Sequence, residues 1–126
     1  MIAVDSSAFI TFFKDENHPV SKEISHLLDT FLLVLPPVVL SELLSDPVLP
    51  DELANALSEL IILHITEGYW QRVGKMRADI LRRGLKSRLA DVMIAQTCID
   101  YNIPLFTCDS DFKHYKDYHK LKLYKF

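Results

Sequence analysis

The chain has 126 residues and a formal net charge of −3, with 49% hydrophobic and 25% charged residues. These ordinary globular values exclude a disordered tail, a collagen-like repeat and a disulfide-framework peptide, and no apolar run approaches the roughly 20 residues that span a bilayer. The first residues lack the basic segment and cleavage signal of a secreted protein, and the two cysteines show no CxxC spacing. We therefore expect a single cytoplasmic domain over residues 1–126 with no membrane partner.

The first half of the chain alternates apolar runs with capping and turn residues. Residues 2–4 form a short apolar run that Asp5, Ser6 and Ser7 close, which predicts a buried strand followed by a helix N-cap. Proline stands at the start of two further helical patterns, where its missing N–H costs no hydrogen bond. The elements expected here are strands at 2–4 and 32–35 and helices over about 8–13, 19–31, 36–44 and 51–58.

The second half continues this alternation. Residues 60–65 are rich in β-branched side chains and predict a third strand. A long helix should follow, capped by Thr66, and the next helix should stop at Asn102 in the left-handed conformation. The elements expected here are strands at 60–65, 105–107 and 121–124 and helices from Thr66 to about Arg83 and over 89–101. Strands that alternate with helices indicate an α/β fold around a mostly parallel sheet.

Five carboxylates stand where an α/β fold places functional groups, at strand ends or near helix starts. Most have an equally simple structural explanation. Asp5 suits a helix cap, Asp109 and Asp111 suit an Asx turn, and Glu42 suits a solvent-facing position. Asp91 differs, because its neighbours at i+3, i+4 and i+7 are apolar, and a carboxylate on an apolar stripe is costly unless it is paired, capped or bound to a metal. Taken one at a time, only Asp91 favours a functional role.

Four short motifs, taken together, carry a resemblance. They are Val4-Asp5-Ser6-Ser7, Val39-Leu40-Ser41-Glu42-Leu43-Leu44, Leu89-Ala90-Asp91-Val92-Met93-Ile94-Ala95 and Leu105-Phe106-Thr107-Cys108-Asp109-Ser110-Asp111-Phe112. In this order and spacing the chain resembles the PIN-domain nucleases, and among these the VapC-type toxins of prokaryotic toxin–antitoxin pairs. The resemblance runs from Ile2 almost to the C-terminus. It implies a three-layer α/β/α domain whose mostly parallel central sheet has about four to five strands.

The resemblance also implies a site. Four acids are expected to converge at one end of the sheet as catalytic metal ligands: Asp5, Glu42, Asp91 and Asp109. Supporting roles are expected for two hydroxyls and one additional acid: Ser7, Thr107 and Asp111. Cys108 departs from the family, because it stands where a basic or polar residue is common, and residues 46–65 match no motif. A cognate antitoxin is a further expectation from the resemblance. A homodimer is expected mainly from the resemblance and in part from apolar helix surface that includes Phe9, Phe12, Phe13 and Trp70.

Such a cluster of acids has a physical consequence of its own. Carboxylates at contact distance cannot all stay ionised near neutral pH without a cation. Oxygen ligands with no His or Cys among them suit Mg²⁺ or Mn²⁺ rather than Zn²⁺, and such an ion activates a bound water and stabilises charge on a phosphate. With the resemblance, this predicts hydrolysis of RNA phosphodiester bonds by metal-activated water, with no covalent intermediate.

Charge is divided unevenly along the chain. Residues 1–70 hold 11 acids and 2 bases, whereas residues 71–126 hold 6 acids and 12 bases. Charge alone favours a solvated helix face and a basic tail, but bases around an acidic, metal-loaded site are also what a phosphodiester backbone requires. The RNA-binding candidates are Arg82, Arg83, Lys86, Arg88 and Lys113.

These features predict a metal-dependent ribonuclease that acts as the toxin of a toxin–antitoxin pair. The alternative is a catalytically weak or inactive module of the same fold that binds RNA or protein. Three glycines and no GxGxxG exclude a dinucleotide fold. Ser7 stands where a haloacid-dehalogenase-like phosphatase has a second acid, and residues 2–7 lack the paired acids of a receiver domain.

Overall fold

A sheet of four parallel strands lies at the centre of the computed structural model, which describes all of residues 1–126. The strands are β1 (Ile2–Val4), β2 (Leu33–Leu35), β3 (Ile61–Ile62) and β4 (Leu105–Phe106). Their order is β3-β2-β1-β4, with β1 paired to both β2 and β4. Because neighbouring strands all run in the same direction, their carboxyl ends meet at one edge of the sheet, where α/β folds place their sites.

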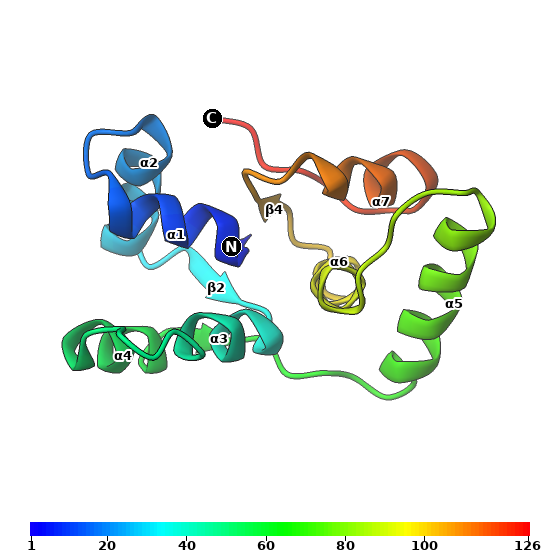
Figure 1. The fold of residues 1–126 in the computed structure, drawn as a ribbon, viewed down its shortest axis with the longest axis horizontal. Helices are drawn as coiled ribbons and strands as arrows, with labels where there is room; N and C mark the ends of the chain where they lie inside the picture. The colour runs from blue at the N-terminus through cyan, green and yellow to red at the C-terminus, as the bar shows by residue number, and fades with distance from the viewer.

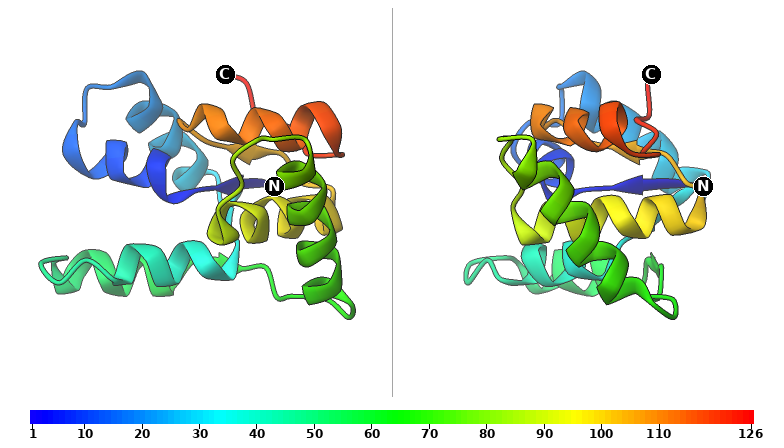
Figure 2. Two further views of the ribbon diagram at one scale, coloured as in Figure 1. Left: turned by 45° about the vertical axis from the view of Figure 1, so that its right-hand side comes forward. Right: turned by 90° about the vertical axis from the view of Figure 1, so that its right-hand side faces the viewer.

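Helices cover both sides of this sheet. They are α1 (Ser6–Lys14), α2 (Pro19–Asp29), α3 (Pro37–Leu44), α4 (Asp51–Ser58), α5 (Tyr69–Arg82), α6 (Leu89–Tyr101) and α7 (Lys113–Tyr118), with a 3-10 turn η1 (Ser110–Phe112) before α7. Figure 1 shows α1 and α2 side by side and α5 beside α6. Figure 2 shows β1 running between α7 on one side and α3 and α6 on the other. The predicted α/β fold with a parallel central sheet is confirmed.

The strands form the centre of the hydrophobic core. All residues of β2 and β4 are buried, as expected for the continuous apolar runs of a parallel sheet that is covered on both faces. Together with residues from the helices they belong to a cluster of 28 buried hydrophobic residues. No helix combines the length and the apolar character that crossing a membrane requires.

Local capping fixes several helix ends where the sequence predicts them. The Asp5 carboxylate accepts the Ala8 N–H at 3.1 Å and begins α1. Pro19 and Pro37 are the first residues of α2 and α3. The predicted left-handed residue after α6 is confirmed, because Asn102 has φ 53°. These caps determine where Asp5 and the first turn of α6 lie relative to the sheet.

Several helix boundaries differ from the prediction by one to three residues, and two of these differences have a clear cause in the backbone. The helix expected after Thr66 begins at Tyr69, because Gly68 occupies the N-cap in a left-handed conformation (φ 78°) that glycine adopts readily. The helix expected to include Phe31 ends at Asp29, because Phe31 has a φ of 57° and leaves the helical path.

Two strands are much shorter than predicted, and β2 and β4 are each one residue shorter. The strand expected over 60–65 is confined to Ile61–Ile62, and the strand expected over 121–124 is reduced to one parallel bridge between Leu123 and Leu105. Both lie beside short partners, since β2 has three residues and β4 has two. A ladder cannot extend beyond the residues that its partner offers, so strongly β-forming side chains do not lengthen it.

Candidate metal centre

The carboxylate of Asp5 lies at the carboxyl end of β1, where the chain turns into α1. Asp5 is only 3% exposed. Its oxygens accept hydrogen bonds from the Ser7 hydroxyl at 2.8 Å, the Thr107 hydroxyl at 2.6 Å and the Ala8 N–H at 3.1 Å. Burial raises the pKa of Asp5, and these hydrogen bonds oppose the rise. Asp5 is therefore both a helix cap and a buried acid at the edge of the sheet.

Two hydroxyls join the ends of β1 and β4. The hydroxyl oxygens of Ser7 and Thr107 lie 3.4 Å apart, and both groups donate to Asp5. Each oxygen also accepts a backbone N–H at 3.0 Å, Ser7 from Cys108 and Thr107 from Asp109. The two hydroxyls predicted to support the site thus contact Asp5 directly and orient the turn that carries Asp109.

Three carboxylates come together in this region. One oxygen from each of Asp91, Asp109 and Asp111 lies within 4.8 Å of the other two, and all three residues are partly buried. Asp91 stands in the first turn of α6. Asp109 caps η1 and accepts the Asp111 N–H at 2.9 Å, which is the predicted Asx turn. The fold therefore brings two of the expected ligands together with an acid that the sequence assigns only a supporting role.

The close approach of these acids alters their protonation. Burial raises the pKa of Asp91 to about 6, and the charge of Asp109 adds to the rise, followed by smaller effects of Glu42 and Asp111. Arg88, at the N-cap of the same helix, acts in the opposite direction. An ordinary aspartate has a pKa of about 4, so Asp91 is markedly harder to ionise here. A cation among these oxygens would favour the ionised form.

Glu42 projects from α3 at the rim of the site. It is exposed, and its carboxylate accepts the Ser6 hydroxyl at 3.4 Å. Burial raises the pKa of Glu42, and the charge of Asp5 contributes to the rise. Glu42 lies outside the group of three carboxylates, although its charge raises the pKa of Asp91. The sequence prediction omits Ser6; its position beside Asp5 in the first turn of α1 is the signal that could have identified it.

Three of the five predicted RNA-binding bases lie on the chain segments next to the acids. The Lys86 ammonium lies 3.7 Å from an Asp111 carboxylate oxygen, and Arg88 precedes the helix that carries Asp91. Lys113 begins α7 directly after η1, and its side chain is exposed. The chain segments that flank the carboxylates therefore carry positively charged side chains.

The other two predicted bases lie at the end of α5. Arg82 is exposed and Arg83 is the C-cap. The Arg83 guanidinium forms a 3.0 Å ion pair with Asp79 and lies 4.2 Å from the centre of the Tyr118 ring. These contacts within the chain occupy part of the Arg83 guanidinium that an RNA phosphate would need.

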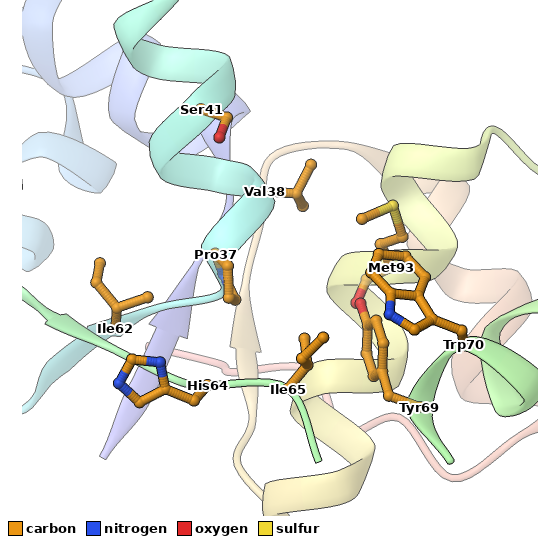
Figure 3. A pocket seen from close by; sticks show the side chains of 9 residues that line it. All are labelled: Pro37, Val38, Ser41, Ile62, His64, Ile65, Tyr69, Trp70 and Met93. Atoms are coloured by element: carbon orange, nitrogen blue, oxygen red, sulfur yellow. The ribbon is translucent and has the colours of Figure 1, made fainter. Parts of the chain in front are cut away.

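An apolar cavity of about 570 Å³ opens between α3, the segment after β3 and the start of α5 (Figure 3). Tyr69, Trp70 and Met93 form one wall and face Pro37 and Val38 across the opening. No carboxylate lines it. Six of its nine lining residues are hydrophobic, so the cavity mainly offers an apolar surface for packing, with Ser41 and His64 among its polar side chains.

Residues 2–118 match the family model described as the PIN domain. The chain belongs to the PIN domain family. The match includes all four of the short motifs, so the resemblance to PIN domains is confirmed. No curated protein sequence matches this PIN domain.

Solved structures share the fold of this PIN domain over almost its whole length. VapBC2 from Rickettsia felis, bound to a DNA fragment from its promoter, aligns with a TM-score of 0.77 and 21% identity over 100% of this chain and 99% of that chain. VapBC-1 from nontypeable Haemophilus influenzae aligns with a TM-score of 0.76 and 20% identity over 99% and 98%. DNA-bound VapBC from Salmonella typhimurium aligns with a TM-score of 0.72 and 18% identity over 98% and 96%. At this level of identity, the alignments establish the fold.

Proposed function

We propose that this PIN domain is a metal-dependent ribonuclease and the toxin of a toxin–antitoxin pair. The observation that carries the proposal is the group of carboxylates from Asp91, Asp109 and Asp111, within 4.8 Å of one another beside the buried Asp5. The PIN family match supports nuclease activity. The toxin role is supported by solved structures of the same fold that are VapBC complexes.

The donor atoms of the site suit Mg²⁺ or Mn²⁺. The clustered groups are all carboxylates, with no His or Cys among them, and hard oxygen donors favour these ions over Zn²⁺. The raised pKa of Asp91, about 6, indicates negative charge that a cation would balance. When bound, such an ion supplies an activated water and offsets the charge that develops on the phosphate. The proposed ligands are Asp5, Glu42, Asp91 and Asp109, and we propose Asp111 as a further one because its carboxylate lies within 4.8 Å of those of Asp91 and Asp109.

The surrounding residues hold these acids in place and bind the substrate. Ser7 and Thr107 donate to Asp5 and fix the orientation of its carboxylate. Glu42 is exposed at the rim of the site and has a raised pKa, and a bound cation would favour its ionised form. Lys86 and Arg88 supply the positive charge that a phosphodiester backbone requires.

Incubation with total RNA tests the proposed activity. The protein is supplied with Mn²⁺, with and without excess EDTA, and the ends of the products are mapped. We expect cleavage that depends on Mn²⁺ and stops in EDTA. RNA that is bound but not cut would instead support the alternative of an inactive or weakly active binding module.

RNA binding should depend on salt and on the bases beside the acids. In EDTA, the double reversal Arg88→Glu/Lys113→Glu should weaken RNA binding at least about tenfold and reduce the salt slope by about 2, because two phosphate contacts and their released counterions are lost. Filter binding across a salt titration measures both quantities. The exposed pair Lys22→Glu/Lys125→Glu carries the same change of charge and serves as the control. Equal losses in both variants would contradict this RNA path.

Expression of the protein alone should arrest growth and degrade RNA, and co-expression of a cognate antitoxin encoded beside it should relieve the arrest. An antitoxin helix would fit the groove of about 480 Å³ that Ile10, Phe13 and Leu43 line beside Glu42. The acidic site would also attract an arginine through charge-assisted hydrogen bonds. Asp91→Asn, expressed to the same level, should be harmless. If the native protein leaves growth and RNA untouched, the toxin role is wrong.

A homodimer is the proposed oligomeric state. Trp70 is 57% exposed and Ile65 is 44% exposed at the cavity of Figure 3, so this face leaves a large apolar surface in contact with water. Light scattering should give twice the monomer mass, and Trp70→Glu should return it to one monomer. Phe31→Glu, at another exposed aromatic position, is the control. A native protein with the monomer mass at every concentration would contradict the dimer.

A further inference from the structure

A buried hydrogen bond joins the two parts of the chain that carry the clustered acids. The hydroxyl oxygens of Ser87 and Tyr115 lie 2.7 Å apart, and the residues are 5% and 1% exposed. Ser87 belongs to the connection between α5 and α6, which passes beside α7 in Figure 1. Tyr115 belongs to α7. The bond thus ties the segment that leads into Asp91 to the helix that follows Asp111.

A second contact secures the same connection from the other side. The Arg77 guanidinium, on α5, donates through Nε to the Ser87 carbonyl oxygen at 2.9 Å. The backbone of Ser87 is therefore held by α5, while its side chain is held by α7. The first turn of α6, with Asp91, begins two residues later.

We propose that Ser87 and Tyr115 are positioning residues that hold Asp91 at metal-binding distance from Asp109 and Asp111. The inference rests on the proposed function, because it assigns these three acids to the metal centre. Like charges on the two segments repel, so the acids separate unless another contact holds them before a cation binds. The Ser87–Tyr115 bond is suited to this task, since it is buried, short and placed four residues from an acid on each segment.

The alternative is that this bond only stabilises the fold, and two kinds of substitution distinguish the roles. Removing one hydroxyl leaves its buried partner without a hydrogen bond, which lowers stability. Removing both hydroxyls leaves no unpaired group and can be nearly neutral. The ring of Tyr115 also packs against Phe112, with centroids 5.9 Å apart, and phenylalanine preserves that contact. Ser87→Ala/Tyr115→Phe therefore removes the tie while it largely restores the stability lost in the single variants.

The experiment measures Mn²⁺ affinity by titration calorimetry, and thermal unfolding in EDTA, for the native protein, both single variants and the double variant. We expect the double variant to unfold near the native temperature and yet to bind Mn²⁺ about tenfold more weakly, the lower end of the loss seen when groups that orient metal ligands are removed. Saturating Mn²⁺ should restore RNA cleavage. Tyr101→Phe is the matched control, because its hydroxyl donates to the His64 carbonyl at 2.7 Å from the other end of α6; it should bind Mn²⁺ normally.

Native-like Mn²⁺ affinity in the double variant would overturn the inference and assign the bond a purely structural role. An equal loss in Tyr101→Phe would overturn it too, because the effect would then be general. If the double variant does not fold, Tyr115→Phe decides alone, and unchanged affinity there has the same meaning. If the native protein itself binds no Mn²⁺, the metal centre and this inference both fail. If the native protein binds Mn²⁺ and the variants bind it equally well, only this inference fails.

Discussion

Asp91→Asn should lower RNA cleavage by more than about 100-fold, because removing a metal ligand costs more than removing a group that only orients one. RNA binding should stay at the native level or become slightly tighter, since the substitution removes a negative charge close to the expected path of the phosphates. The side chain is nearly isosteric, and its loss of charge relieves repulsion within the cluster. The free energy of unfolding in EDTA should therefore not fall.

A cleavage time course and filter binding, both on the same RNA, separate these effects. Asp117→Asn is the matched control, because Asp117 is an exposed aspartate on α7 and the substitution changes the net charge equally. It should cut and bind RNA as the native protein does. Native-rate cleavage by Asp91→Asn would show that the carboxylates of the cluster are not the catalytic groups.

Asp5 and Asp91 could be placed from the sequence because local rules suffice for them. A three-residue apolar run followed by Asp-Ser-Ser defines a strand end and a helix cap, and the structure has both at Asp5. An acid among apolar helical neighbours predicts a carboxylate that needs compensation, and Asp91 has a pKa raised to about 6. In each case the signal lies within seven residues of the acid.

The rest of the site depends on contacts that no local pattern encodes. Ser87 and Tyr115 are 28 positions apart, and their bond exists only because α7 packs over the connection into α6. The contact of Lys86 with Asp111 arises from the same packing. The predicted RNA-binding base is therefore also the ion-pair partner of an acid in the cluster. The lengths of β3 and of the bridge at Leu123 likewise depend on their partner strands, and β propensity alone cannot determine them.

The ion pair of Arg83 could have been predicted from the sequence. Arg83 lies four residues after Asp79, a spacing at which opposite charges on a helix commonly pair. The structure contains this ion pair at 3.0 Å, and His119 also contacts Asp79 at 2.9 Å. A basic residue with an acid one turn before it is a weaker candidate for RNA than one without.

Metal-free protein should lose stability as the pH rises from about 4 to about 6, and Mn²⁺ should reverse this loss. The pKa of Asp91 is raised to about 6, from an unfolded value of about 4. A raised pKa means that the folded state binds the proton more tightly, so this contribution is complete below about pH 4 and disappears as the pH passes 6. Burial shifts the pKa of Asp5 and Glu42 in the same direction. The pKa values of Asp79 and Asp100 are lowered by their ion pairs, so these two groups change the stability only in more acidic solution.

Mn²⁺ should raise the melting temperature by about 10 °C at pH 7.5 when its concentration is a hundred times its Kd, which corresponds to roughly 2.7 kcal/mol in a chain of this size. At pH 5 the rise should be small, because protons compete with the ion for the same oxygens. Thermal unfolding with Mn²⁺ and with EDTA, across this pH range, measures both effects. Asp5→Asn/Asp91→Asn should show neither the metal response nor most of the pH dependence. Asp29→Asn/Asp117→Asn, with two exposed aspartates changed in the same way, should behave as the native protein. An equal Mn²⁺ response in the first variant would place the ion elsewhere on the molecule, since the groups proposed to hold it would then contribute nothing to its binding.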